Sequence, residues 1–354
     1  MNKVYIFGAH SRAQTTAVYL IKTMGKLSIE GFLVDNDEKN EKEIDGIPVI
    51  DIRHKAELDI KCPVYIGTRG IYHDDVTKRL EKLGFTDIRP VTVELDTELR
   101  NIYFTWVFAD EGRDFRKITE IDAKADHTED ISSCIYEVRS IYDKSLEKDT
   151  YVKRDYERPI QVGSALTDLR LSECEVRDDT GENISEKNRQ LCEVTALYWM
   201  WKSAKEDYQG LVHYRRHFIL PDDWTGRMAE ADADILLPVP LYLGPSIGEN
   251  YRFRHVSEDW DVLMEVLDDE AAEECFSKTT FFPCNMFVMK RDVLDDYCSR
   301  LFPVLFEVME RVGTHEDTYQ NRYPAFMAER LLNLYCYKRR NDLKIIYADK
   351  NFLS

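Results

Sequence analysis

Five consecutive residues in the second half of the chain have side chains that could do chemistry: His213, Tyr214, Arg215, Arg216 and His217. Arginine presents a planar fork of donors that matches phosphate oxygens, and its charge is permanent. The apolar run 210–212 directly precedes them and predicts a brief buried strand. Because open α/β sheets place their ligands at strand ends, we expect this basic cluster to bind an anion there.

The overall charge of the chain makes the basic cluster informative. The sequence has 66 acidic and 48 basic side chains, which gives a net charge of −18. We expect no nucleic-acid partner, since affinity for nucleic acid depends on many distributed Lys and Arg side chains. A small anionic ligand such as a diphosphate fits better. The alternative is that Arg215 and Arg216 pair with some of the many carboxylates.

A long helix should position the strand and its basic cluster. Apolar residues at helical spacing predict it from Ser185, a plausible cap, to near Ala204. Asn183, Lys187 and Asn188 surround its start, where backbone donors and the helix dipole favour an anion. Capping alone would also explain Asn183 and Ser185.

The N-terminal segment has the pattern of a β-α-β unit. An apolar strand is followed by a loop at 8–13, a helix, and a second strand that ends in Asp35. The dinucleotide fingerprint is incomplete, because His10 and Ala13 replace its second and third glycines. We therefore expect that this unit does not use NAD.

Residues 1–92 resemble the Rossmann-like N-terminal domain of bacterial sugar O-acyltransferases, notably in the acidic turn after the second strand and in the segment GIPVI. A module that has lost its ligand and serves in docking or oligomerisation remains an alternative. The pattern weakens over 93–133, which we interpret as a connector, and a second domain is expected at 134–354.

Eight cysteines are scattered without a paired spacing, so neither a zinc site nor a disulfide framework is predicted. No signal-peptide core and no membrane-spanning apolar run is recognised in the sequence. We expect a cytoplasmic protein, and peripheral attachment to the inner face of the membrane through a partner stays open.

The second domain resembles a bacterial family of glycosyltransferase-like proteins of capsular and exopolysaccharide synthesis, long catalogued as a domain of unknown function. The motifs that carry the resemblance are PIQVGSAL, NISEKNRQLCEVTALYWMWKS, GLVHYRRHF, DILLP, NMFVMKRDVLDDYCSRLFPVLFE and FMAERLLNLY. The resemblance implies an α/β fold of the GT-A type. It also implies transfer of a sugar from a nucleotide-sugar donor, with a uridine diphosphate donor expected, to a lipid-linked or oligosaccharide acceptor.

Such a transferase must neutralise the departing diphosphate, and many use a divalent metal, Mn or Mg, held by an Asp-x-Asp motif after a strand. Here Asp232 and Asp234 precede the apolar run 235–237 instead. We therefore favour a reaction in which Arg215 and Arg216 take the place of the metal, so that no cofactor is required. The metal site at Asp232 and Asp234 is the alternative.

The remaining candidates are scattered along the second domain. Arg252 and Arg254 follow a Gly- and Pro-containing loop that could form a mobile lid, although an ordinary loop is equally consistent. Asn285 could bind sugar hydroxyls or simply form a turn. Glu329 interrupts the apolar face of the last helix and is our first candidate for the base of an inverting reaction, ahead of Glu193. A surface ion pair would also explain Glu329.

Two other functions remain open from the sequence. The first is an NAD-dependent sugar-nucleotide oxidoreductase or epimerase run by the N-terminal domain, which would need a working glycine loop. The second is a non-catalytic scaffold that binds sugar nucleotides within a polysaccharide assembly complex. Turnover of a nucleotide sugar separates the scaffold from a glycosyltransferase.

Overall fold

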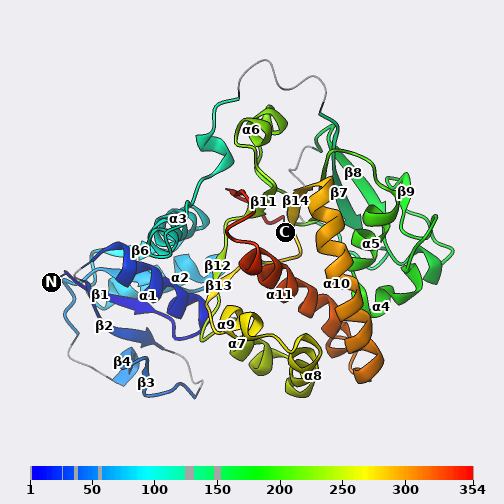
Figure 1. Cartoon of the computed structure of the whole chain (residues 1–354). Coiled ribbons are helices and arrows are strands. Elements are labelled where there is room, and N and C mark those ends of the chain that lie inside the picture. Colours follow the sequence, from blue (N-terminus) through cyan, green and yellow to red (C-terminus); the bar gives the residue numbers. More distant parts are fainter. Residues whose placement is uncertain are drawn as a thin grey trace. The chain divides into compact units, whose positions relative to one another are not determined.

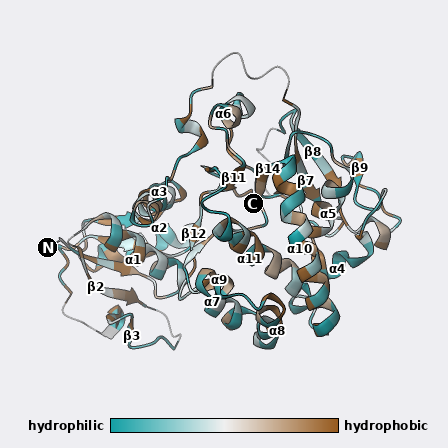
Figure 2. Cartoon of the chain, viewed as in Figure 1, coloured by the Kyte–Doolittle hydropathy of each residue, from teal (hydrophilic) through white to brown (hydrophobic). Residues whose placement is uncertain are grey.

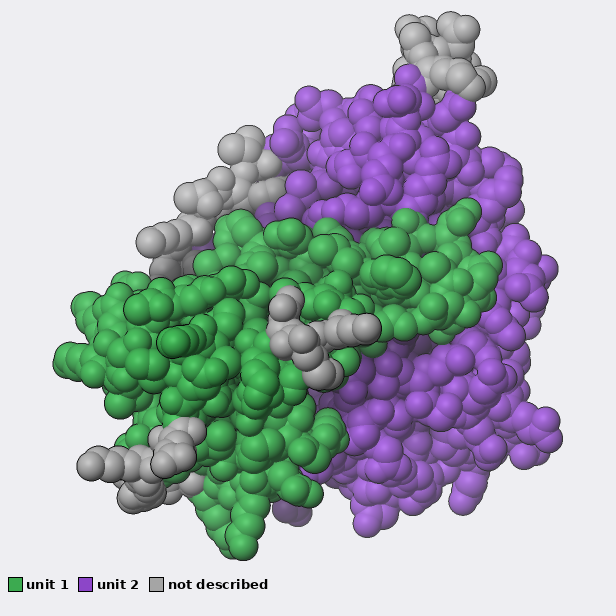
Figure 3. Space-filling model, turned by 90° about the vertical axis from the view of Figure 1, so that its left-hand side faces the viewer, with its two compact units in different colours: residues 1–115 green, residues 116–354 purple. Residues whose placement is uncertain are grey.

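The chain forms two compact units, Met1–Phe115 and Arg116–Ser354, which are drawn in green and purple in Figure 3. The computed structural model describes residues 2–25, 27–35, 39–54, 58–123, 131–146 and 153–353. Within them, no helix combines the length and the apolar character that crossing a membrane requires.

Unit 1 is a Rossmann-like α/β layer structure (Figure 1). Its sheet has the order β3-β4-β2-β1-β5-β6, and every pair is parallel except β3 with β4. The elements are β1 Asn2–Phe7, α1 Ser11–Thr23, β2 Leu27–Val34, β3 Glu43–Ile44, β4 Ile47–Asp51, β5 Val64–Ile66, α2 His73–Lys82, β6 Ile88–Pro90 and α3 Val93–Asp110.

Helix α3 corrects the predicted connector. Its residues Phe104 and Phe108 are fully buried, and the Tyr103 ring lies 4.9 Å from the ring of Tyr19 on α1. The apolar segment that starts the expected connector is therefore a helix of unit 1, because its aromatic residues share one face that packs on α1. Residues 124–130, also assigned to the connector, lie outside the described part of the chain.

The loop after β1 packs too closely for larger residues. A Cβ on Gly67 would lie 2.7 Å from Cα of Ala13, and Gly8 has a φ of +108°. Asp35, which lies where dinucleotide-binding units carry a ribose-binding carboxylate, forms an ion pair with Arg79 of α2. The ion pair of Asp35 uses the carboxylate at the end of β2 within the fold. That the unit does not use NAD stays a prediction.

Unit 2 is built on a seven-stranded sheet with the order β15-β11-β14-β10-β7-β8-β9. Strand β14 is antiparallel to both neighbours, and the other neighbouring pairs are parallel. This is a GT-A-like α/β arrangement. The strands are β7 Ser133–Arg139, β8 Glu157–Gln161, β9 Val176–Arg177, β10 Tyr208–His213, β11 Ile235–Pro238, β14 Phe287–Lys290 and β15 Ile345–Ala348, with a separate pair β12 Leu241–Tyr242 and β13 Thr280–Phe281.

Helices cover the sheet of unit 2 and complete its core. Helix α10 is amphipathic (Figure 2) and buries residues such as Tyr297 and Phe302. The helices are α4 Asn188–Leu191, α5 Val194–Ser203, α6 Trp224–Glu230, α7 Ile247–Arg254, α8 Ser257–Leu267, α9 Glu270–Phe276, α10 Arg291–Val312 and α11 Tyr323–Lys338.

The single helix predicted from Ser185 to Ala204 is broken. A 3-10 turn, η6 Ser185–Lys187, leads into α4, and the chain then turns at Cys192, where φ is +48°, before α5 begins. Ser185 is no cap, since its hydroxyl donates to Oδ1 of Asp178 and accepts from the Ala165 backbone N–H at 3.0 Å. The break places the residue after Cys192, Glu193, at the start of α5.

Candidate functional site

A cavity of about 500 Å³ lies at the carboxyl ends of the parallel strands β7, β8 and β10. We call it the strand-end cavity. Its lining comes from the segments 138–143, 162–167, 188–193, 213–216 and 315–322. The end of β10 thus delivers part of the basic cluster to a hollow, as the sequence predicted from the order of strand and cluster.

The turn after β10 brings some side chains of the basic cluster to the cavity and others away from it. His213 and Arg216 exchange backbone hydrogen bonds of 3.2 and 2.8 Å, so they are directly opposed and project to one side. Both line the cavity together with Tyr214, whereas Arg215 does not. The Arg215 guanidinium instead lies 5.1 Å from the centre of the Tyr214 ring.

Three arginines line the strand-end cavity: Arg189, Arg216 and Arg322. Within the residues that the structure describes, none of the three forms an ion pair with a carboxylate. Arg322 instead donates from Nε to the Cys192 sulfur at 3.0 Å. In a chain with a net charge of −18, three arginines gathered around one cavity suit an anionic ligand.

The alternative of carboxylate pairing does not describe the neighbouring arginines Arg215 and Arg216. The Arg216 guanidinium lies 5.3 Å from the centre of the Phe352 ring. Neither arginine has an ion-pair partner among the described residues. Arg189 and Arg322 were missed by sequence reasoning, although Arg189 directly follows the candidates Lys187 and Asn188; only the fold brings both arginines to the cavity that Arg216 lines.

Two carboxylates also line the cavity, Glu193 and Asp143. Burial raises the pKa of the Asp143 carboxyl from its ordinary value of 3.8 to about 6, against the backbone donor of Ser140 and the charges of Arg139 and Arg215. The Ser140 N–H donates to Oδ2 of Asp143 at 2.8 Å. Asp143 was not among the sequence candidates; its place just after an apolar strand was the available signal.

Glu329 of α11 is not part of the cavity lining. Its Oε1 accepts from the Cys284 backbone N–H at 2.8 Å, and Oε2 accepts from Arg330 at 2.9 Å. Burial raises the pKa of Glu329, Arg330 opposes this rise, and nearby Glu193 adds to it. Glu329, the first candidate for the base, is therefore hydrogen-bonded outside the cavity lining. Glu193, the second candidate, lines the cavity.

The expected lid is a helix. Residues 247–254 form α7, which Ser246 caps by accepting from the Glu249 N–H at 3.1 Å, and Tyr251 anchors it in the core. Arg252 donates to Asp261 at 2.6 Å and Arg254 is exposed; neither lines the cavity. The Gly- and Pro-containing connection is confined to residues 243–246, between β12 and α7, because the cap at Ser246 and the buried Tyr251 start the helix earlier than the sequence suggested.

Of the three candidates around the start of the central helix, Asn188 lines the cavity and the other two do not. Asn183 forms a local turn with Gly181 and Ser185, and the exposed Lys187 does not line the cavity. Asn188 does line it, and its amide nitrogen donates to the Cys192 carbonyl at 2.7 Å. Asn285 is 1% exposed, so it is buried behind the cavity instead of facing a sugar.

Asp232 and Asp234 lie at the opposite edge of the sheet, just before β11. Lys290 contacts them at 3.0 and 2.9 Å, and Lys344 contacts Asp232 at 2.6 Å. Hydrogen bonds from Lys344 and Lys290 lower the pKa of Asp232 to about 2. In the described part of the chain, no three His, Cys, Asp or Glu residues are grouped as metal ligands.

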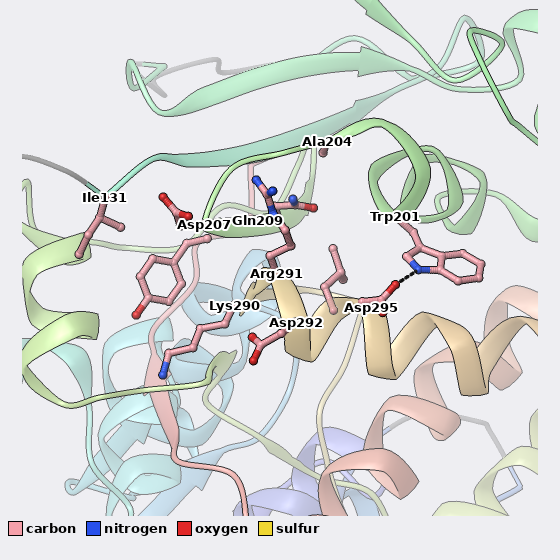
Figure 4. Close-up of a pocket in the computed structure, with 11 residues that line it drawn as sticks. Ile131, Trp201, Ala204, Asp207, Gln209, Lys290, Arg291, Asp292 and Asp295 are labelled. Carbon is pink, nitrogen blue, oxygen red and sulfur yellow. Dashed lines mark hydrogen bonds between the residues drawn. The ribbon is translucent and has the colours of Figure 1, made fainter.

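A larger cavity of about 660 Å³ occupies that opposite edge, where β10 begins and β14 ends (Figure 4). Its two cationic side chains are used within the fold: Lys290 pairs with Asp232 and Asp234, and Arg291 donates to the Glu206 carbonyl at 3.2 Å. Figure 4 shows the bond of 2.7 Å from Trp201 to Asp295. Among the described residues, its charged lining is one lysine, one arginine and three aspartates, so it lacks the group of arginines that lines the strand-end cavity.

Comparison with curated proteins finds no match. The apo structure of the WbbM bifunctional glycosyltransferase is similar to this chain, with a TM-score of 0.54 and 25% sequence identity. The similarity covers 63% of this chain and 45% of WbbM, so it spans less than half of that protein. The family model described as a domain of unknown function, DUF4422, matches residues 141–340, more than half of the sequence, and the chain belongs to that family.

Proposed function

We propose that this protein is a glycosyltransferase that moves a sugar from a uridine diphosphate sugar to a glycan acceptor. The observation that carries the proposal is the set of three arginines, Arg189, Arg216 and Arg322, around a cavity at the carboxyl edge of the sheet. A nucleoside diphosphate is an anion of suitable charge for them. The similarity to WbbM, which is described as a glycosyltransferase, supports sugar transfer as the reaction.

The arginines have a role in the chemical step. When the bond from the sugar C1 to the diphosphate oxygen breaks, negative charge grows on the leaving group. Arg216 approaches from the turn after β10, and Arg322 approaches from the segment before α11, so that two separate elements supply charge. Donors that the fold holds in place stabilise this charge without reorganising during the reaction.

We propose that the leaving group departs without a metal ion. The support is the position of the Asp-x-Asp motif: Asp232 and Asp234 lie at the far edge of the sheet from the arginines, and two lysines bind them. Removal of divalent metal with EDTA should therefore leave turnover unchanged.

The acceptor is proposed from the family resemblance alone. It is a lipid-linked or oligosaccharide glycan of capsular or exopolysaccharide assembly, which would bring the protein to the inner face of the membrane. Unit 1 would serve as a docking or nucleotide-binding module in that assembly.

The experiment is donor hydrolysis by the purified full chain across a panel of nucleotide sugars, since transferases pass sugars slowly to water. Release of uridine diphosphate from one donor, slowed by about a hundredfold in Arg216→Ala, is the expected result. Binding of nucleotide sugars without turnover, even with glycan acceptors added, would favour the scaffold instead. Reduction of NAD in the same panel would favour the oxidoreductase.

A further inference from the structure

The turn before β14 has an uncommon backbone. Cys284 and Asn285 are consecutive residues with φ of +75° and +47°, and Cys192, which precedes Glu193, has φ of +48°. Residues other than glycine seldom adopt this left-handed conformation, and such strain gathers at functional sites. Both strained segments meet at one side chain, because Nδ2 of Asn285 donates to Oε1 of Glu193 at 2.8 Å.

The burial of the Asn285 side chain lowers the stability of the fold. Its side chain is 1% exposed, and its Oδ1 atom has no hydrogen-bond partner among the described residues. A buried polar atom without a partner destabilises the fold. The nitrogen of the same amide makes the bond to Glu193 and a longer one, 3.3 Å, to the Ala325 carbonyl. A role of the Asn285 amide in orienting the Glu193 carboxylate would explain why the unpaired oxygen and the strained turn are kept.

The same turn is held from two other directions. Nε2 of His213 donates to the Cys284 carbonyl at 2.6 Å, and Glu329 accepts from the Cys284 N–H. His213 lines the cavity, whereas Glu329 does not. The turn is thus fixed between the end of β10 and α11, with Glu193 as the carboxylate on its cavity side.

We propose that Glu193 is the catalytic base of the transfer and that Asn285 is its positioning residue; this inference rests on the proposed function. The acceptor hydroxyl gives its proton to the Glu193 carboxylate while its oxygen forms a bond to C1 of the donor sugar. The bond from C1 to the diphosphate oxygen breaks, and the diphosphate leaves with that electron pair beside Arg216 and Arg322. One bond forms and one breaks at C1, as an inverting displacement requires.

Two other carboxylates fit the role less well. Both oxygens of Glu329 accept hydrogen bonds from other groups, outside the cavity lining. Asp143 lines the cavity, but its one hydrogen bond in the described structure comes from Ser140, within its own turn. Glu193 is held by a buried amide from a distant part of the chain, which gives the orientation that proton transfer needs.

The test uses the full chain, the donor that the wild type turns over, and three variants: Glu193→Gln, Glu329→Gln and Asn285→Asp. Glutamine at 193 keeps an oxygen that can accept from Asn285, so the fold should persist. We expect Glu193→Gln to lower kcat by about a hundredfold or more, with binding of uridine diphosphate, measured by calorimetry, within about threefold of wild type. Glu329→Gln changes the competing candidate and should lower kcat less than Glu193→Gln does, because Glu329 contacts the turn at Cys284 and not the reacting hydroxyl.

Asn285→Asp keeps the shape of the side chain and tolerates the left-handed backbone, but it replaces the N–H donor facing Glu193 by an oxygen, which as a carboxylate can only accept. It should lower kcat and leave KM for the donor nearly unchanged, whereas a purely structural role would weaken donor binding and thermal stability together. Wild-type turnover in Glu193→Gln, or a greater loss in Glu329→Gln, would overturn the inference while leaving the transferase intact. Failure of the wild type to bind uridine diphosphate or hydrolyse any donor would overturn the proposed function, and the role of Glu193 with it.

Discussion

Nε of Arg322 donates to the sulfur of Cys192 across 3.0 Å, which links the segment before α11 to the break between α4 and α5. Burial raises the pKa of the Cys192 thiol to about 11, so the sulfur stays neutral near pH 7. The thiol orients the guanidinium without neutralising it. The Phe326 ring, 5.5 Å from the guanidinium carbon, supports it further.

Replacing Arg322 by alanine should therefore impair the chemical step. If the charge acts on the departing diphosphate, kcat for donor hydrolysis should fall by about a hundredfold. Arg322→Lys should recover only part of it, since lysine keeps the charge and loses the fork. Arg300→Ala, which removes an exposed arginine of α10, is the control and should match wild type. Equal turnover in Arg322→Ala and wild type would exclude this role.

Arg216 and Arg215 are neighbours in sequence with different surroundings, and their variants should differ. Arg216→Ala should lower kcat by about a hundredfold, because Arg216 lines the cavity. Arg215→Ala should have a smaller effect. Each is assayed with and without EDTA, beside Asp234→Asn. Loss of activity with EDTA, matched by Asp234→Asn while both arginine variants stay active, would show a metal-dependent site instead.

Asp178 should be essential to the fold around the cavity. Its fully buried carboxylate accepts from the backbone N–H groups of Gly163 and Ser164, at 2.9 and 3.1 Å. It also accepts from the hydroxyls of Ser185 and Thr195. An amide cannot accept at both positions, so Asp178→Asn should lower the free energy of unfolding by about 3 kcal/mol.

Urea denaturation followed by circular dichroism measures this loss. The control is Asp179→Asn, which removes a partly exposed carboxylate that pairs with Arg177 at 3.3 Å. That change should cost less than about 1 kcal/mol. Equal midpoints for the two variants would show that the Asp178 network does not stabilise the fold.

Asp143 should make stability depend on pH. Its pKa is raised from 3.8 to about 6 in the folded protein, so the folded state binds the proton more tightly than the unfolded state. Its contribution is fully favourable below pH 4 and is lost as the pH rises through 6. Asp143→Asn should thus raise the free energy of unfolding by about 1–3 kcal/mol at pH 7.5 and have little effect on it at pH 4.

Thermal or urea unfolding at the two pH values checks this prediction. The comparison is the difference between variant and wild type at each pH, so that other titrating groups cancel. A stabilisation of the same size at both values would mean that the pKa of Asp143 is ordinary in the folded protein.

The sequence by itself determined the elements whose signals are local. An apolar strand followed by His213 and Arg216 predicted a basic turn at a strand end, and the structure has β10 ending at His213. The β-α-β pattern of unit 1 was equally local. The order of Asp234 and the following apolar run predicted that these carboxylates precede a strand, and the structure has that strand as β11.

Only the tertiary structure decided which distant side chains share the cavity. Arg322 and Cys192 are separated by 130 residues, and Asn285 and Glu193 by 92. No periodicity or motif records such pairs, because they depend on how strands order in the sheet. The choice between Glu193 and Glu329 was undecidable from sequence for the same reason: each is a glutamate of a predicted helix, and only the tertiary structure shows that Glu193 lines the cavity and Glu329 does not.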